Sequence, residues 1–175
     1  MPVGMCRDRL ADAIARFGRV PIHRRTLTVT PDHPAFRRQE QGPQWAAGGL
    51  VHDPRRRVLL IRHVASSGWG SSWLTPGGWL EEGERVDDGL RREIWEEVGL
   101  EIDRAVLTRI LNDTITDGAR VCHAYFAQFV AAARSAQVRE GPAIAEARWF
   151  ARLPEAMAFR ADYVGDFQGL IAGRF

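Results

Sequence analysis

The sequence contains no lysine, so all 24 of its basic residues are arginines. Arginine binds phosphate through a planar bidentate fork. However, 24 arginines in 175 residues are more than phosphate binding needs, and such a composition is typical of a GC-rich genome. The 22 acidic residues leave a formal net charge of only +2. Bulk electrostatics therefore gives no strong indication of nucleic-acid binding.

Cysteine and long apolar segments are also scarce. The two cysteines, Cys6 and Cys122, lie far apart and have no Cys/His metal spacing, which predicts free thiols in a reducing compartment. No stretch approaches the length of a membrane span, and the first residues lack the apolar region of a signal peptide. These absences predict a cytoplasmic protein that does not enter a membrane.

The composition, 45% apolar and 26% charged residues, is typical of a folded domain of ordinary size. The first 44 residues predict an extension of this domain. Residues 7–17 have helical apolar spacing, and this helix could dock on the core or on a second copy of the chain, as in a homodimer. Residues 20–30 predict a strand, and the proline-containing residues 31–44 predict a connector.

Residues 45–175 show a mixed pattern of strands and helices, which predicts an α/β sandwich. Apolar runs at 45–52 and 58–64 flank a hairpin signal at 53–57, and Pro76, Gly77 and Gly78 predict a tight turn. Further strands are expected at 102–111, 119–130 and 147–150, and further helices at 84–98, 154–160 and 163–172. Gly99 is well placed as the glycine that follows the end of the helix at 84–98.

Negative charge is concentrated in one segment of the chain. Residues 76–103 hold ten acidic residues and three arginines. In the helix expected at 84–98, Glu93, Glu96 and Glu97 fall within an arc of roughly 100°, beside an apolar face that recurs every four residues. These carboxylates lie near the helix C-terminus, where the helix dipole disfavours anions.

A divalent cation would resolve this conflict, because Mg²⁺ prefers oxygen ligands shared between protein carboxylates and substrate phosphates. The structural alternative is a solvent-facing acidic helix whose glutamates pair with arginines, which is the commoner outcome for an isolated pair of glutamates. The full spacing decides between these interpretations. From Gly78 it runs through Glu84, Arg92 and Glu93 to the adjacent pair Glu96 and Glu97, and then to Gly99 and Leu100.

This spacing, over residues 78–100, resembles the Nudix box without a departure at any defining position. The flanking segments AAGGLV, VLLIRH and ARWF are also similar to those of the Nudix family, so the resemblance runs from residue 45 to residue 175. The resemblance implies a Nudix fold, a mixed sheet sandwiched between helices, preceded by an N-terminal extension at residues 1–44. The implied activity is hydrolysis of a nucleoside diphosphate linked to another moiety.

The resemblance also implies roles for individual residues. Glu93 and Glu97 would bind Mg²⁺ or Mn²⁺, with Glu96 and the carbonyl group of Gly77 as further ligands. Arg92 would orient the glutamates. The residues expected to support the site structurally are Gly78, Glu84 and Gly99.

The general base and the substrate stay open at this level. The base is either a box glutamate or one from a later loop, Glu140 or Glu146. Arg62 and Trp79 are the candidate substrate-binding residues, and a nucleoside triphosphate, an oxidised one or ADP-ribose would each fit. The alternative function is a non-catalytic Nudix-fold nucleotide sensor or interaction protein. Sensors usually lose box glutamates, whereas this chain keeps them all, which favours an enzyme.

Overall fold

A computed structural model of the chain describes residues 3–37 and 44–175, with side chains from residue 8 onwards in the first helix. Its helices are α1 (Val3–Phe17), α2 (Pro34–Arg37), the 3₁₀ helix η2 (Ala65–Ser67), α3 (Val86–Val98) and α4 (Arg160–Ile171). Its strands are β1 (Ile22–Thr28), β2 (Gln44–His52), β3 (Val58–His63), β4 (Gly77–Trp79), β5 (Ile102–Thr116), β6 (Val121–Ala133) and β7 (Ile144–Phe150). Within this part of the chain, no helix is long and apolar enough to cross a membrane.

The strands form one seven-stranded mixed sheet in the order β1-β5-β6-β2-β3-β7, and β4 pairs with β2 outside this path. β1 runs parallel to β5 and β2 parallel to β6, whereas the other neighbouring strands are antiparallel. β2 lies centrally and is buried along nearly its whole length, as expected for a strand covered on both faces. Its pairing with β4 places Gly77 opposite Gly48 and Gly78 opposite Ala47.

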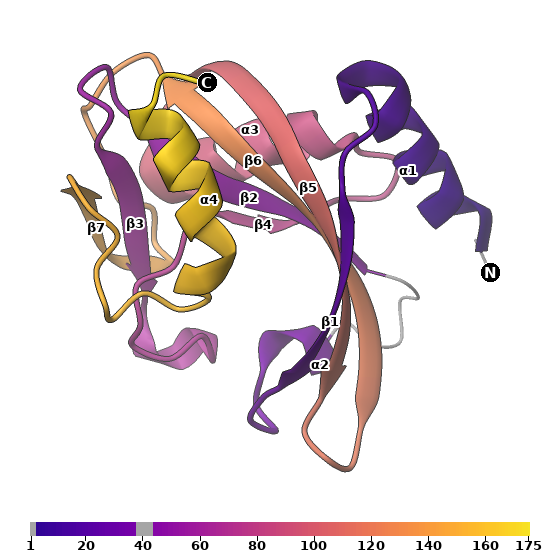
Figure 1. Ribbon diagram of the computed structural model, residues 1–175. Coiled ribbons are helices and arrows are strands. Elements are labelled where there is room, and N and C mark those ends of the chain that lie inside the picture. Colours follow the sequence, from indigo (N-terminus) through magenta and orange to yellow (C-terminus); the bar gives the residue numbers. More distant parts are fainter. Residues whose placement is uncertain (1–2, 38–43) are drawn as a thin grey trace.

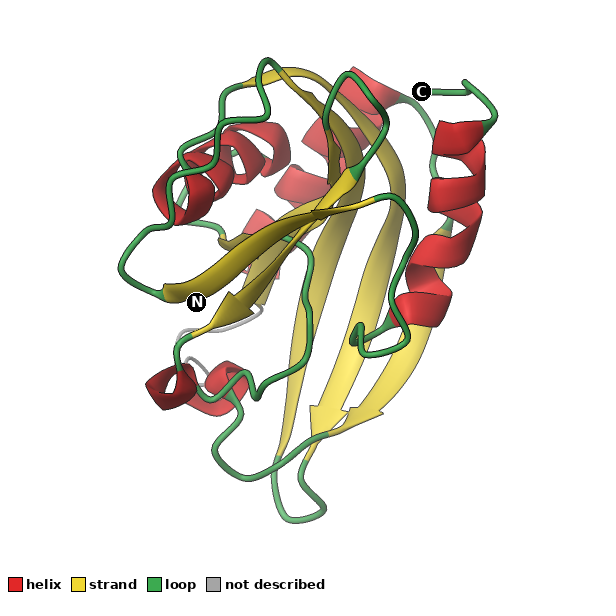
Figure 2. Ribbon diagram, turned by 90° about the vertical axis from the view of Figure 1, so that its left-hand side faces the viewer, coloured by secondary structure: helices red, strands yellow, loops and turns green. Residues whose placement is uncertain are grey.

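Helices cover both faces of this sheet (Figure 1 and Figure 2). On one face, α3 and α1 pack in the larger hydrophobic cluster, where Leu90 and Ile94 are fully buried. On the other face, α4 contributes Tyr163 and Leu170 to a second cluster. The predicted mixed sheet between helices is therefore confirmed, and the apolar face of the acidic helix lies in the core as expected.

The N-terminal extension is joined to this sheet and its core. β1 pairs with β5 over its full length, from Ile22 opposite Ile110 to Thr28 opposite Thr116. Of the two alternatives for the first helix, the structure has docking on the core: Ala13 is fully buried in the larger cluster. A homodimer stays a prediction, as does the division of the chain at residue 44.

Three local predictions were wrong. Residues 76–78, expected as a tight turn, lead directly into β4, because β2 offers an unpaired edge at this point. Residues 154–160, expected as a helix, instead pair with the backbone of Trp73. The Trp73 N–H donates to the Ala156 carbonyl, and the Trp73 carbonyl accepts from the Ala158 N–H. Residues 31–44 are not only a connector, since they contain α2, while residues 38–43 lie outside the described part.

Of the two expected free thiols, Cys122 is buried and forms no disulfide. The side chain of Cys6 lies outside the described part of the chain.

Candidate active site

Three of the four defining glutamates of the box, Glu93, Glu96 and Glu97, occupy the last two turns of α3 but differ in their exposure. Glu97 is only 8% exposed as a residue, whereas the side chain of Glu96 is 56% exposed. Glu93 lies between these extremes. The ridge therefore runs from the solvent towards the interior, and the deepest carboxylate is that of Glu97.

Arg92 connects the outer part of the ridge to the segment that precedes α3. Its guanidinium group forms a bidentate ion pair with Glu84, at 2.8 and 2.9 Å. It also donates to Glu93 at 2.9 Å, to Glu96 at 3.2 Å and to the carbonyl group of Trp79 at 3.0 Å. The hydrogen bonds from Arg92 hold the pKa of Glu84 below its usual value. Arg92 thus fixes the position of three box glutamates relative to the end of β4.

Glu97 has a different environment. Its Oε2 accepts a hydrogen bond from the backbone N–H of Gly77 at 2.9 Å, and its Oε1 lies 3.7 Å from Nε2 of His63. Burial raises the pKa of Glu97 to about 8, with further contributions from the charges of Glu93 and Glu96. Burial lowers the pKa of His63, which disfavours the charged form of the imidazole beside this carboxylate. Among the described residues, the ion-pair partner of Glu97 is therefore a histidine whose positive charge burial disfavours.

Two glycines of β4 form the backbone side of the site. Gly77 has φ = +143° and lies so close to β2 that a Cβ atom there would be 2.3 Å from the Ala47 carbonyl oxygen. A Cβ atom at Gly78 would be 2.4 Å from Oε2 of Glu93. Both positions therefore require glycine for close approach, one to the neighbouring strand and the other to a box carboxylate.

The C-terminal end of α3 is capped by backbone N–H groups. Gly99 adopts the left-handed conformation, with φ = 65°, and its N–H binds the Trp95 carbonyl. The N–H groups of Arg139 and Gly141 bind the carbonyls of Val98 and Glu97, at 2.9 and 2.7 Å. The loop before β7 thus satisfies carbonyls that a helix end leaves without intrahelical partners.

Glu140 and Glu146, the later candidates for the general base, have contacts that differ from those of the box glutamates. Glu140 is next to Gly141 and so lies near the end of α3, but its carboxylate accepts a hydrogen bond from the backbone N–H of Ala147 in β7. Glu146 pairs with Arg62 at 3.3 Å. The structure therefore brings the Glu140 backbone to the acidic helix and directs its carboxylate towards β7.

The two candidate substrate-binding residues lie in different places. Arg62 stacks over the ring of Trp73, at 4.1 Å from its centroid, in addition to its ion pair with Glu146. Trp79 lines a cavity that also includes His63, Gly77 and Gly78. The geometry therefore joins Trp79, but not Arg62, to the surface beside the carboxylate site.

The oxygen atoms at this site fit a hard divalent cation in kind. Glu93, Glu96 and Glu97 supply carboxylate oxygens, and Gly77 supplies a backbone carbonyl, which are the ligands that Mg²⁺ prefers. A cation would also place a positive charge beside the buried carboxylate of Glu97. Across residues 3–37 and 44–175, however, no group of three or more acidic, histidine or cysteine side chains is already arranged around a metal position. In this structure the carboxylates of Glu93 and Glu96 accept hydrogen bonds from Arg92 instead.

Replacing Arg92 with lysine tests the importance of its fork. Lysine keeps the charge but cannot bind Glu84 in a bidentate manner while also reaching Glu93. We expect activity or apparent Mg²⁺ affinity to fall about 10- to 100-fold, the usual effect of losing a group that orients metal ligands. Titration of the rate with Mg²⁺ measures this. The control is Arg85→Lys, because Arg85 is 59% exposed and pairs only loosely with Asp12; equal rates in the two variants would contradict the prediction.

Sequence reasoning missed two residues of the cavity, Arg25 and Asp113. Arg25 belongs to the N-terminal extension, and Asp113 lies beyond the predicted end of its strand. The available signal was Asp113, a charged residue at a position of β5 whose side chain faces inward by strand alternation. This signal could not identify the partner strand.

Comparison with known proteins agrees with this geometry. The model of the NUDIX domain family matches residues 42–162, so the chain belongs to the Nudix family. An 8-oxo-dGTP diphosphatase of Proteus vulgaris is 33% identical over 61 residues, which are 35% of this chain and 54% of that protein. The nucleoside triphosphatase NudI of Escherichia fergusonii is 45% identical over 49 residues, 28% of this chain and 33% of that protein. The chain thus matches about half, or less, of the length of these relatives.

Solved structures show the same fold over a larger part of the chain. A MutT NUDIX hydrolase from Burkholderia pseudomallei has a TM-score of 0.55 and 28% identity, covering 67% of this chain and 91% of that one. A NUDIX hydrolase from Nitrosomonas europaea has a TM-score of 0.56 over 77% of this chain and 73% of that one, but only 19% identity. The second similarity therefore concerns the fold alone.

Proposed function

We propose that the protein is a Mg²⁺- or Mn²⁺-dependent Nudix hydrolase that cleaves a pyrophosphate bond in a nucleotide. The observation that carries this proposal is the environment of Glu97. Its carboxylate is buried beside two other glutamates, it is held by the N–H of Gly77, and its histidine neighbour, His63, has a pKa that burial lowers. Such an arrangement is costly for stability alone, but it is suited to a metal ion and a pyrophosphate.

The residues of this site have distinct proposed roles. Glu93 and Glu97 hold the metal, with Glu96 and the Gly77 carbonyl as further ligands. When bound, the metal polarises a phosphoryl oxygen and lowers the pKa of a water molecule. Arg92 fixes the glutamates in position for these contacts, and such positioning supplies a large part of the rate enhancement in phosphoryl transfer.

The general base is one of two groups. A box glutamate that does not hold the metal could accept the proton, or Glu140 could do so if its carboxylate left the backbone of Ala147. The structure favours a box glutamate, because the Glu140 carboxylate is bound to the backbone of β7. Comparison of Glu140→Gln with Glu96→Gln distinguishes these groups by the rate of single turnover.

The substrate is proposed to be a nucleoside triphosphate, including an oxidised one. The names of the curated relatives support this class, and the cavity beside Gly77 and Gly78 offers room for the nucleoside. A cytoplasmic location, expected from the sequence, belongs to the same proposal.

A substrate panel with controlled metal content tests this function. We expect release of pyrophosphate or phosphate from at least one nucleoside triphosphate in the presence of Mg²⁺. In excess EDTA the rate should fall by more than about 10³-fold, because several kcal/mol of transition-state stabilisation would be lost with the metal. Addition of Mg²⁺ beyond the EDTA should restore the rate. Unchanged rates in EDTA would instead indicate metal-independent chemistry. Binding of nucleotides without any turnover would indicate a sensor.

A further inference from the structure

The cavity beside the carboxylate site has an apolar floor. Side chains of β1, β5 and β6 form it, among them Leu27, Leu111 and Phe126. Gly77 and Gly78 line the same cavity, and these glycines also contact the carboxylates of the box. A single ligand can therefore place one of its groups in the cavity and its pyrophosphate at the glutamates.

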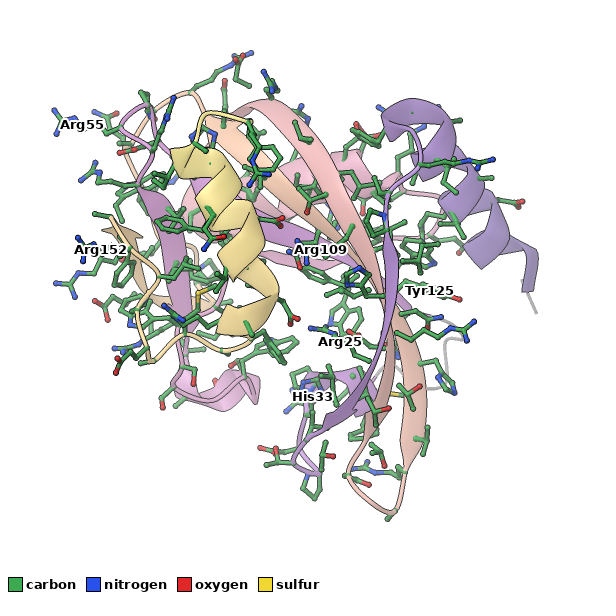
Figure 3. All side chains as sticks on the ribbon, in the orientation of Figure 1. Arg25, His33, Arg55, Arg109, Tyr125 and Arg152 are labelled. Carbon is green, nitrogen blue, oxygen red and sulfur yellow. The ribbon has the colours of Figure 1, made fainter. Side chains whose placement is uncertain are left out.

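A cluster of partly buried charges interrupts this apolar surface. Arg25 of β1 donates two hydrogen bonds to Asp113 of β5, at 2.8 and 2.7 Å, and a third to Asp162 of α4. The Arg25 side chain is 19% exposed and that of Asp113 only 6%. Figure 3 shows Arg25 on the side of β1 that faces α4, with His33 nearby. Two of the five N–H groups of Arg25 have no acceptor among the described residues.

The balance of charge in this cluster disfavours a phosphate group. Arg25 carries one positive charge, whereas Asp113 and Asp162 carry two negative charges. Burial lowers the pKa of His33, which disfavours a positive charge on this neighbouring side chain. A ligand for this part of the cavity is therefore not an anion, and it has hydrogen-bond acceptors for Arg25 and donors for Asp113.

Aromatic side chains of the cavity favour a planar ligand. Trp69 and Phe159 both line it, and the Phe159 ring lies 5.5 Å from the Arg25 guanidinium carbon. Phe159 has φ = 55°, an unfavourable conformation for a bulky residue, and its side chain stays 42% exposed. Backbone strain of this kind is retained where surrounding structure enforces it, often at ligand sites.

A purely structural role would not require this ion cluster. Replacing a buried ion pair by apolar residues of similar size is often neutral or stabilising. Moreover, Arg25 lies before residue 42, where the match to the family model begins. The charged cluster is therefore contributed in part by the extension of this chain rather than by the shared domain.

We propose that this cavity binds the nucleobase of the substrate and that Arg25 and Asp113 determine which base is accepted. The side-by-side guanidinium and carboxylate groups present a donor and an acceptor to the edge of the base, while Trp69 and Phe159 contact its faces. This proposal rests on the proposed function for the identity of the ligand. It assigns to the N-terminal strand β1 a specificity-determining residue.

Equilibrium binding of non-hydrolysable ligands tests the proposal. The ligands are the α,β-methylene diphosphates of adenosine and guanosine, and methylenediphosphonate, which lacks the nucleoside. We expect the wild-type protein with Mg²⁺ to bind the preferred nucleoside analogue about 10- to 100-fold more tightly than methylenediphosphonate, because a stacked base contributes this much. It should discriminate between the two bases by roughly 5- to 150-fold, the range for one bidentate contact.

Three variants and one control variant separate the contributions. The double variant Arg25→Met/Asp113→Leu replaces the ion pair with apolar side chains and should bind both nucleoside analogues equally, with unchanged affinity for methylenediphosphonate. Arg25→Lys keeps the charge without the fork and should reduce the discrimination, which provides a second test if the double variant does not fold. Trp69→Leu should weaken the binding of both nucleoside analogues. Trp95→Leu replaces a 50% exposed tryptophan on α3 and should change the affinity for neither analogue.

The outcomes are unambiguous. Loss of base discrimination in the double variant or in Arg25→Lys supports the proposal. A wild-type ratio between the two nucleoside analogues in both variants overturns it, as does equal binding of all three ligands by the wild-type protein. Because the ligands cannot be hydrolysed, a protein that binds them selectively but cleaves no nucleoside triphosphate would refute the proposed function and leave this inference standing.

Discussion

Glu97→Gln is expected to reduce the rate of hydrolysis by at least about 10³-fold while the fold is retained. Glutamine preserves the shape of the side chain and can still accept the hydrogen bond from Gly77. It removes the charge proposed to bind the metal, however, and metal-based charge stabilisation contributes several kcal/mol. Steady-state rates over a range of Mg²⁺ concentrations measure the effect. Full activity at any Mg²⁺ concentration would exclude Glu97 as a metal ligand.

The same variant should be more stable than the wild-type protein when no metal is present. The pKa of Glu97 is raised to about 8 in the folded protein, above its value of about 4.3 in an unfolded chain. The folded state therefore binds this proton more tightly, so the wild-type protein loses stability as the pH rises through this interval. Glutamine does not titrate. The Tm difference between variant and wild type in EDTA should thus increase from pH 5 to pH 8.

Glu101→Gln is the matched control for both measurements. Glu101 follows the box directly, but its side chain is 59% exposed and pairs with Arg134 at the surface. Surface ion pairs of this kind contribute little. We expect wild-type rates and no pH-dependent gain in Tm from this variant. A Tm difference for Glu97→Gln that stays constant between pH 5 and pH 8 would contradict the proposed cost of burying its charge.

Gly78→Ala is expected to lower kcat by about 10²-fold through a single added methyl group. The Cβ atom would lie 2.4 and 2.8 Å from the two carboxylate oxygens of Glu93, so this carboxylate must move. It is the end of a flexible side chain, and its movement leaves the core intact. A displacement of about 1 Å at a reacting centre can cost roughly this factor in rate. Rate measurements together with thermal unfolding separate the loss of activity from a loss of stability.

Gly165→Ala provides the control for an added methyl group. Gly165 lies in α4, and a Cβ atom there has no heavy atom within 4 Å. Alanine is favoured over glycine inside a helix by about 1 kcal/mol, so this variant should keep its activity and gain some stability. Wild-type kcat in Gly78→Ala would show that the position of the Glu93 carboxylate does not control the rate.

The acidic helix was the part of the molecule that the sequence predicted best. Its apolar repeat of every four residues, together with Gly99 after its end, defined α3 to within two residues of its observed bounds. These signals are local, because helical hydrogen bonds and the C-terminal cap join residues only a few positions apart. The contact between Arg92 and Glu84, eight residues apart, is of the same kind.

The sequence did not predict the parts that depend on distant partners. β4 is only three residues long, and its strand conformation results from pairing with β2. Arg25 carries no local signal of its role, since its partners Asp113 and Asp162 are 88 and 137 residues away. The pattern of β1 indicated a strand but could not indicate which edge it would join.

The pairing of β1 with β5 has a consequence for the order of folding during synthesis. The hydrogen bond between Gly77 and Glu97 spans 20 residues, so this part of the molecule can close soon after it leaves the ribosome. Strand β1 is synthesised first but has to wait for its partner 88 residues later, and Arg25 must wait still longer for α4. Strand β1, which is synthesised first among the strands, is thus among the last to pair. The proposed base-recognition residue Arg25 would therefore reach its final position after the carboxylate site has formed.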